Sequence, residues 1–242
     1  MYSIDLNCDM GEGTGNDALL MPYISSCSIA CGGHYGTKQS IAATATLAKA
    51  QGVRIGAHPA YPDPENFGRK SMDLSHGSLQ DALRRQLDTF FSVCTVVNHI
   101  KPHGALYNDL FFDHEKAAAV VAVFSEYAPG IKVYCAPGSQ LATVAAEQGF
   151  SVRLEAFADR AYASDGTLVA RTKKNAVLID KQHMAQQLIQ IIKSETVTSI
   201  TGEIIPMKAQ TICLHGDGVG VVENAAFLVE SLKQNRISVE GL

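Results

Sequence analysis

The sequence predicts an α/β protein, a distorted (β/α) TIM-like barrel of about seven parallel strands. Short apolar runs alternate along the chain with longer segments whose apolar residues recur at helical spacing. Most of the apolar runs end in His, Asp or Glu beside Gly or Pro, as strands do where they form the active site of such a barrel. A doubly wound open sheet is the alternative for the same order of elements.

The predicted strands are short apolar runs bounded by turn residues. In the first, Tyr2, Ile4 and Leu6 alternate with smaller or polar residues, and Gly11 and Gly13 then allow the backbone to bend. In chain order the predicted strands cover 2–7, 26–30, 53–57, 96–101, 132–136, 150–156 and 211–214.

The predicted helices lie between these strands. Leu79, Leu83 and Leu87 show the expected spacing, and Gly52 and Pro129 supply stop signals for two other helices. The predicted helices cover 38–51, 78–93, 114–127, 139–148, 181–193 and 222–234. The Pro-rich segment 61–69 is predicted to be a loop, and the charged segment 159–174 to be a lid or rim.

Length and composition limit the class of protein. A chain of 242 residues is expected to form one domain, residues 1–242. The net charge of −4 argues against nucleic acid as a partner, and no apolar run reaches the roughly 18 residues that cross a membrane. The first strand begins almost at the first residue, so we expect no signal peptide and a cytoplasmic location.

Six cysteines lie mostly in apolar runs, which predicts buried free thiols in a reducing compartment. Cys27, Cys31 and His34 form a C-x3-C-x2-H pattern that resembles part of a zinc site. We do not interpret it as one, because strand geometry places the two thiols at opposite ends of the strand and a fourth ligand is missing.

Titratable side chains gather where the predicted strands end. They are Asp9, Glu12, His34, His58, His103, Glu155, Asp159, His215 and Asp217. Because the carboxyl ends of parallel strands meet at one mouth of a barrel, we expect these side chains to share a site. The other histidines lie in helices, helix flanks or the middle of a strand and are interpreted as structural; they are His76, His99, His114 and His183.

Histidines and carboxylates in one cavity can hold a divalent metal ion or act as general acid and base. Either use suits hydrolysis of an amide or ester. The chain has no G-x-x-x-x-G-K-[ST] loop, no G-x-S-x-G turn and no H-E-x-x-H helix. The glycine-rich turns 11–15 and 216–220 have backbone N–H groups that could bind an anion.

Eight segments of the sequence resemble the LamB/YcsF family, the A subunits of bacterial ATP-dependent 5-oxoprolinase. The segments are DLNCDMGEG at 5–13, IACGGH at 29–34, GAHPAYPD at 56–63, ENFGR at 65–69, KPHGALYN at 101–108, FADRAY at 157–162, SITGE at 199–203 and ICLHGD at 212–217. They span nearly the whole chain in order. One loop departs from the family pattern Gly-x-His-Ala-Gly-Asp, because Thr37 stands where the family has Asp.

The resemblance implies a barrel of the glycoside hydrolase/deacetylase type. It also implies opening of 5-oxoproline (pyroglutamate) to glutamate, with ATP as the cofactor that is hydrolysed and with two partner subunits, B and C. The subunit that binds ATP is left open, as is the presence of a divalent metal ion.

By analogy with the deacetylase arrangement of one Asp and two His, the metal candidates are Asp9, His58 and His103. The catalytic candidates are Asp9, Glu12, His34, Glu155, Asp159, His215 and Asp217. Arg69, Lys101 and Arg160 are candidates for binding the substrate carboxylate or nucleotide phosphates. Two other functions stay open: a stand-alone metal-dependent deacetylase of sugars or amines, and a subunit that binds substrate without catalysis.

Overall fold

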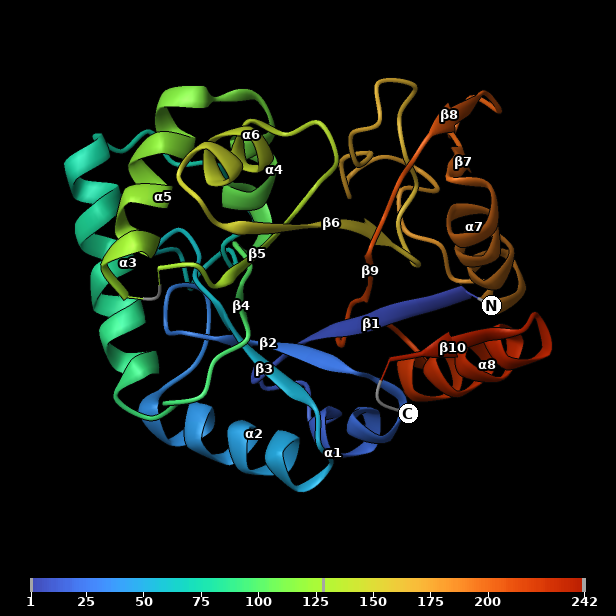
Figure 1. The fold of residues 1–242 in the computed structure, drawn as a ribbon, viewed down its shortest axis with the longest axis horizontal. Helices are drawn as coiled ribbons and strands as arrows, with labels where there is room; N and C mark the ends of the chain where they lie inside the picture. Colours follow the sequence, from blue (N-terminus) through green and yellow to red (C-terminus); the bar gives the residue numbers. More distant parts are fainter. Residues whose placement is uncertain (1, 128, 241–242) are drawn as a thin grey trace.

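Seven parallel strands close into a barrel in the computed structural model, which describes residues 2–127 and 129–240 (Figure 1). The strands are β1 (Tyr2–Met10), β2 (Ser26–Ala30), β3 (Arg54–His58), β4 (His99–Ile100), β5 (Lys132–Cys135), β6 (Ser151–Phe157) and β9 (Thr211–Leu214). Each strand pairs with the next, and β9 returns to pair with β1, so the sheet has no open edge there. The predicted barrel is therefore confirmed, and the open sheet is excluded.

Helices follow the strands and surround the barrel (Figure 1). They are α1 (Asp17–Leu20), α2 (Lys38–Ala50), α3 (His76–Phe91), α4 (Gly104–Phe112), α5 (His114–Tyr127), α6 (Gln140–Glu147), α7 (Lys181–Ser194) and α8 (Val221–Gln234), with a 3-10 turn at Met21–Tyr23. Thr37 caps α2, because its side chain accepts a hydrogen bond from the Ser40 N–H. None of the helices in the described ranges is long and apolar enough to cross a membrane.

The structure corrects several predicted bounds. β1 continues to Met10 rather than ending at Asn7, because the polar residues after Asn7 still pair with β2. The predicted strand 96–101 reduces to His99–Ile100, since the preceding residues form a turn and Pro102 cannot donate to a ladder.

Several short elements were missing from the sequence prediction. Helix α4 begins soon after β4 and is apolar on most sides, so it lacks a helical period. The hairpin of β7 (Thr196–Thr198) and β8 (Ile204–Pro206) and the strand β10 (Ile237–Val239) have three residues each, too few to show alternation. The four-residue helix α1 is likewise too short to show a period.

The apolar core lies between the strands and the helices, whereas the inside of the barrel is polar. Along β1, Asp5 and Asn7 contact side chains from across the barrel, while the residues between them belong to the apolar core. Ser25, Ser26 and Thr211 donate hydrogen bonds to the Asp5 carboxylate at 2.6–2.9 Å. Buried polar groups need such partners, so the interior is a hydrogen-bonded column that leads to the mouth.

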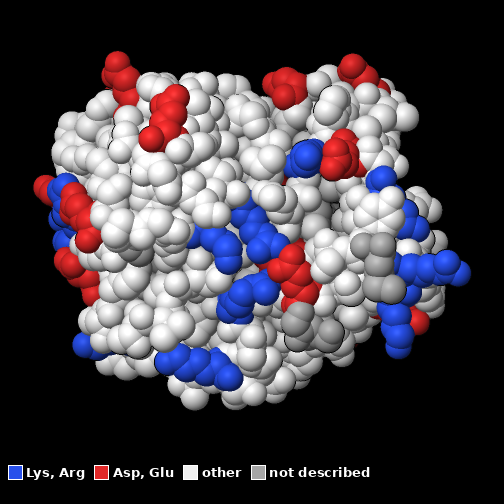
Figure 2. All heavy atoms as spheres, viewed as in Figure 1, with Lys and Arg blue, Asp and Glu red and all other residues white. Residues whose placement is uncertain are grey.

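Both termini of the described chain lie on the face seen in Figure 1, and β10 pairs with the start of β1 there. In Figure 2, which shows the same face, basic side chains gather around acidic ones near its middle. Among the charged groups at the strand starts, Arg54 and Arg153 both pair with Glu240, at 3.0 and 2.5 Å. This end of the barrel is thus closed by ion pairs.

Candidate active site

A cavity of about 450 Å³ opens at the carboxyl ends of the strands. Asp9, His58, His103 and His215 line it, although they follow four different strands. Its other lining residues are Arg69, Lys101, Pro102, Gly104, Ala105, Tyr107, Asn108, Phe157, Arg160, Leu168, Ala170, Arg171 and Thr172.

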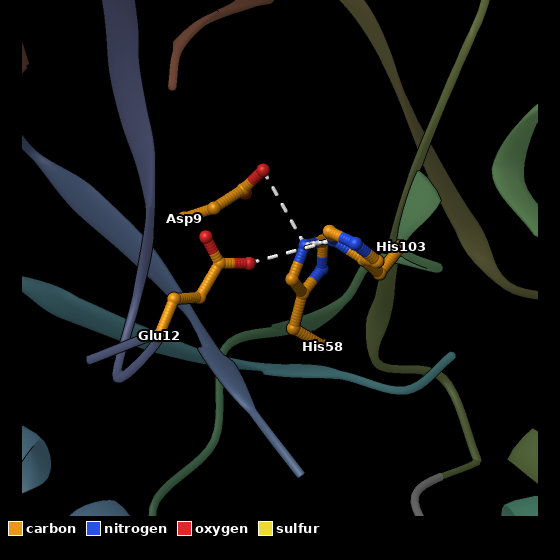
Figure 3. Close-up of side chains that lie close together, drawn as sticks. All are labelled: Asp9, Glu12, His58 and His103. Atoms are coloured by element: carbon orange, nitrogen blue, oxygen red, sulfur yellow. Dashed lines mark hydrogen bonds and ion pairs between the residues drawn. The ribbon is translucent and has the colours of Figure 1, made fainter. Parts of the chain in front are cut away.

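Four side chains converge on one point beside this cavity; three of them line it, and Glu12 does not. Asp9, Glu12, His58 and His103 each direct one ligand atom there, and these atoms lie within 4.8 Å of one another (Figure 3). His58 Nε2 is 3.4 Å from Asp9 Oδ2 and 3.0 Å from His103 Nδ1, which in turn is 3.5 Å from Glu12 Oε1. We call these four residues the carboxylate–histidine cluster.

The outer nitrogen of each imidazole in the cluster contacts a backbone carbonyl. His58 Nδ1 lies 2.7 Å from the Lys101 oxygen, and His103 Nε2 lies 2.9 Å from the Phe67 oxygen. A carbonyl only accepts hydrogen bonds, so these nitrogens carry the protons. In the neutral rings, the lone pairs of His58 Nε2 and His103 Nδ1 then face each other.

This arrangement fits a divalent cation. Two facing lone pairs and two carboxylates repel one another unless a cation or a proton lies between them. Imidazole and carboxylate ligands suit Zn²⁺ and related transition metals, and a carbonyl behind each metal-binding histidine is the usual support. The residues that would hold the ion are the metal candidates Asp9, His58 and His103, together with Glu12.

The two carboxylates of the cluster titrate in opposite directions. Burial alone would raise the pKa of Asp9, but the charge of His58 in its protonated form and the charge of Lys101 outweigh it and hold the pKa well below its usual value. Burial and the charge of Asp9 raise the pKa of Glu12 to about 7. Asp9 is therefore ionised, and Glu12 can exchange a proton near neutral pH.

His34 lies behind the cluster and does not line the cavity. Its Nε2 is 2.9 Å from Glu12 Oε1, and its ring stacks on His103. Burial lowers the pKa of His34 to about 3, so the ring is neutral and donates to Glu12. Burial and the neighbouring imidazoles likewise hold the pKa of His103 well below its usual value. Both rings can thus be stacked without charge repulsion.

His215 and Asp159 form a second polar pair on another wall of the cavity. His215 Nδ1 is 3.0 Å from both Asp159 carboxylate oxygens, and its ring stacks on Phe157 at 5.3 Å. The other nitrogen, Nε2, makes no hydrogen bond with any described residue. A histidine oriented by a carboxylate in this way can take a proton from a nucleophile.

Lys101 is a buried residue of the cavity lining and pairs with the buried Glu155. Its Nζ is 2.7 Å from Asp9 Oδ1 and 2.9 Å from Glu155 Oε1, and it also contacts Asn7 and Cys213. An ammonium group has three N–H donors, so these contacts leave none for a ligand. Glu155 does not line the main cavity and instead lines a second one of about 240 Å³.

The arginine candidates lie at the rim. Arg69 pairs with Asp217, and hydrogen bonding and the positive charge of Arg69 hold the pKa of Asp217 below its usual value although burial opposes this. Arg160 donates to the carbonyl oxygens of Val169 and Ala176. The loop that carries these carbonyls has no helix or regular strand between residues 159 and 174, in line with the predicted rim.

Sequence reasoning missed Asn7, Phe67 and Arg171. Asn7 could have been found, because it lies between Asp5 and Asp9 in the alternation of β1. The Phe67 carbonyl has no sequence signal, since any residue has one. Arg171 lies in the segment predicted as a rim, but nothing in its sequence context distinguishes it from the neighbouring basic residues.

The cysteines behave as predicted, since all six are buried and free. Cys27 lies within β2, and the Cys31 thiol accepts a hydrogen bond from the His58 N–H at 3.2 Å. Neither belongs to the metal-capable group found among the described residues. Thr37 has a structural use as the cap of α2, a position where Asp is equally favourable.

Comparisons with known proteins agree with this geometry. The A subunit of a 5-oxoprolinase from Clostridium beijerinckii is 40% identical over 99% of this chain and 97% of its own length. A lactam utilization protein of Thermus thermophilus superposes with a TM-score of 0.89 at 33% identity, with full coverage of both chains. A structure described as T48 deacetylase with substrate, at 11% identity, covers 98% of this chain and 87% of its own with a TM-score of 0.52, which shows a likeness of fold alone.

The family model of LamB/YcsF matches residues 4–242, nearly the whole sequence. The matched region contains every member of the carboxylate–histidine cluster, the His215–Asp159 pair and the arginines of the rim. The chain therefore belongs to the LamB/YcsF family.

Proposed function

We propose that this chain is the A subunit of a 5-oxoprolinase and that it opens 5-oxo-L-proline to L-glutamate, coupled to ATP hydrolysis, with two partner subunits, B and C. The observation that carries the proposal is the carboxylate–histidine cluster facing the His215–Asp159 pair across one cavity. The relatives named as the A subunit of 5-oxoprolinase match over nearly their full length. Six reduced, buried cysteines fit a cytoplasmic protein.

The reaction explains why ATP is needed. A five-membered lactam is a stable amide, and its nitrogen is a poor leaving group. Phosphorylation of the lactam oxygen would make the ring carbon open to attack by water. A divalent ion in the carboxylate–histidine cluster would polarise the oxygen on that carbon.

The remaining steps are proton transfers that the chain's own residues can perform. His215 Nε2 takes a proton from the attacking water while Asp159 holds the ring in position. The new carbon–oxygen bond forms and the carbon–nitrogen bond of the ring breaks, which leaves an acyl phosphate that a second water cleaves to glutamate and phosphate. The protonated His215 gives its proton to the departing nitrogen.

The other candidate residues support these groups. Lys101 keeps Asp9 ionised, and Glu155 is a counter-ion of Lys101 rather than an acid or base. His34 orients Glu12 through its hydrogen bond. Asp217 holds Arg69 at the rim, where Arg69 and Arg160 attract an anionic substrate.

The test is to purify the chain with and without its partner subunits and to supply 5-oxoproline and ATP. We expect glutamate and ADP to form together in the complete assembly, and His215→Gln to lower the rate of turnover by about 100-fold or more. His183→Ala, at an exposed position on α7, is the control and should leave the rate unchanged. Full turnover with His215→Gln would exclude this mechanism.

Two other functions give different results in the same experiment. A stand-alone deacetylase would release acetate from an acetylated sugar or amine without ATP, and only with a metal ion; the donor set of the cluster favours this as the second candidate. A chain that only binds substrate would bind 5-oxoproline, yet Asp9→Asn and His215→Gln would leave turnover of the complex unchanged. Nucleotide binding measured separately on each subunit would assign the ATP site.

A further inference from the structure

Three guanidinium groups line the cavity, but only one has a carboxylate partner among the described residues. Arg69 pairs with Asp217. Arg160 and Arg171 line the same cavity, and neither forms an ion pair with any carboxylate in the described ranges. The nearby carboxylate of Asp159 is already bonded to His215.

Arg160 is unusual because it is a buried cation that forms no direct ion pair with a described carboxylate. Only 5% of the Arg160 surface is exposed to solvent. Two backbone carbonyls hold it, Ala176 at 3.3 Å from Nε and Val169 at 2.6 Å from Nη2. Nη1 makes no hydrogen bond with a described residue. Burial of a charge that has no paired opposite charge raises the free energy of the folded chain, so a bound anion would stabilise Arg160.

Arg171 adds a second positive charge to the lining of the same cavity. Burial and the charge of Arg171 lower the pKa of Arg160 to about 10, which still leaves Arg160 protonated at neutral pH. Asp159 and Asp217 lie near enough to offset part of these charges, but they already pair with His215 and Arg69, so an anionic ligand would relieve the remaining repulsion between the two guanidiniums. Arginine pairs are suited to this task, since each guanidinium can bind a carboxylate through two parallel hydrogen bonds.

We propose that Arg160 and Arg171 form the subsite that binds the carboxylate of a cyclic amide substrate. The inference rests on the proposed function and deepens it by naming what selects the substrate. Arg160 is fixed by the two carbonyls, and Arg171 comes from the irregular loop at the rim. With the carboxylate held there, the opposite side of the ring is directed toward the carboxylate–histidine cluster. Arg69 contributes less, because Asp217 neutralises it.

The subsite predicts strong selection for lactams that carry a carboxylate. A ring without this group, such as 2-pyrrolidinone, would leave both guanidiniums unpaired in the cavity. We expect it to bind at least about 100-fold more weakly than 5-oxoproline, since an unpaired polar group in a site built for a partner is heavily penalised.

The test measures binding of 5-oxoproline, 2-pyrrolidinone and inorganic phosphate to the full chain by calorimetry. The variant is Arg171→Gln, and the matched control is Lys173→Gln, which removes the same charge from an exposed position of the same loop that does not line the cavity. We expect Arg171→Gln to weaken 5-oxoproline binding by about 10- to 100-fold, Arg171→Lys by less, and Lys173→Gln by under about twofold. In the assembled complex, Arg171→Gln should raise KM with little change in kcat.

Several results would overturn the subsite. Equal binding of 5-oxoproline and 2-pyrrolidinone by the unaltered chain would do so, as would equal effects of Arg171→Gln and Lys173→Gln. Loss of phosphate binding alone in Arg171→Gln would assign the subsite to a phosphoryl group instead. If the complete assembly does not turn over 5-oxoproline, the proposed function fails. Acetate then replaces 5-oxoproline as the carboxylate probe in the binding measurement. If Arg171→Gln binds acetate as tightly as the unaltered chain does, the subsite is overturned as well.

Discussion

The imidazole rings of His34 and His103 stack face to face, with centroids 3.7 Å apart and planes within 4° of parallel. Both are buried and neutral, as the lowered pKa values of the two rings require. The stack ties the loop after β2 to the loop after β4, and through Glu12 it also reaches the end of β1. The carboxylate–histidine cluster therefore depends on close packing behind it.

Gly68 lies against this stack, and we expect Gly68→Ala to disturb the cluster. A Cβ atom there would lie 2.9 Å from His34 Cβ and 3.1 Å from His103 Cδ2. The control is Gly149→Ala, which has a similar positive φ but open space around it. Both changes should cost about 1–2 kcal/mol of stability through backbone strain. Only Gly68→Ala should also weaken Co²⁺ binding, by about 10-fold, in a spectroscopic titration.

His103→Ala tests the metal candidate directly. Removal of one imidazole ligand should lower the affinity for Zn²⁺ by about 100-fold or more and abolish turnover in the assembled complex. His183→Ala removes an imidazole from the surface of α7 and should change neither. Near-normal turnover of His103→Ala would remove His103 from the mechanism, and unchanged metal affinity would remove it from the ligand set.

Lys101→Met is expected to be strongly destabilising. It would leave Asp9 and Glu155 as buried carboxylates without their shared cation, which typically costs about 3–5 kcal/mol. The second change, Glu155→Gln, should recover part of this loss because it removes one of the two unpaired charges. Urea unfolding of the single and double variants measures the difference. A double variant less stable than Lys101→Met would contradict the ion-pair assignment.

The lowered pKa of the Asp5 carboxyl group predicts that the fold loses stability in acid. Burial would raise its pKa, but hydrogen bonds from Ser25 and Thr211 and the charge of Arg54 outweigh it and lower the pKa from 3.8 to about 2. A carboxylate whose pKa is lower in the folded chain stabilises the fold above the unfolded pKa. That contribution, on the order of 2 kcal/mol, disappears as the pH falls from 3.8 through about 2.

The measurement for Asp5 is the free energy of unfolding as a function of pH. Asp5→Asn should be less stable at neutral pH and should lose less stability than the unaltered chain between pH 4 and pH 2. The exposed carboxylate Asp73 provides the control, and Asp73→Asn should keep the original slope. An unchanged slope in Asp5→Asn would show that other groups control the acid transition.

Much of the fold could be predicted because its signals are local. The predicted bounds of β2, α5 and β9 match the structure, those of α2 and α8 differ by one residue at one end, and those of α6 differ by one residue at each end. These elements have clear alternation, a helical period or a glycine or proline stop. Helix α4 and the three-residue strands have none of these, so only their packing against the barrel creates them.

The sequence by itself determined that His and carboxylate groups would end the strands and that the strands would run parallel, because both follow from residue types next to one another in the chain. The tertiary structure decided which groups face each other. The facing lone pairs of His58 and His103 depend on two backbone carbonyls, and the occupied N–H donors of Lys101 depend on partners in three other strands. Such contacts join residues that are far apart in the sequence. The charge, burial and tautomer of each side chain depend on which groups lie close to it in space, and the order of residues in the chain does not reveal this.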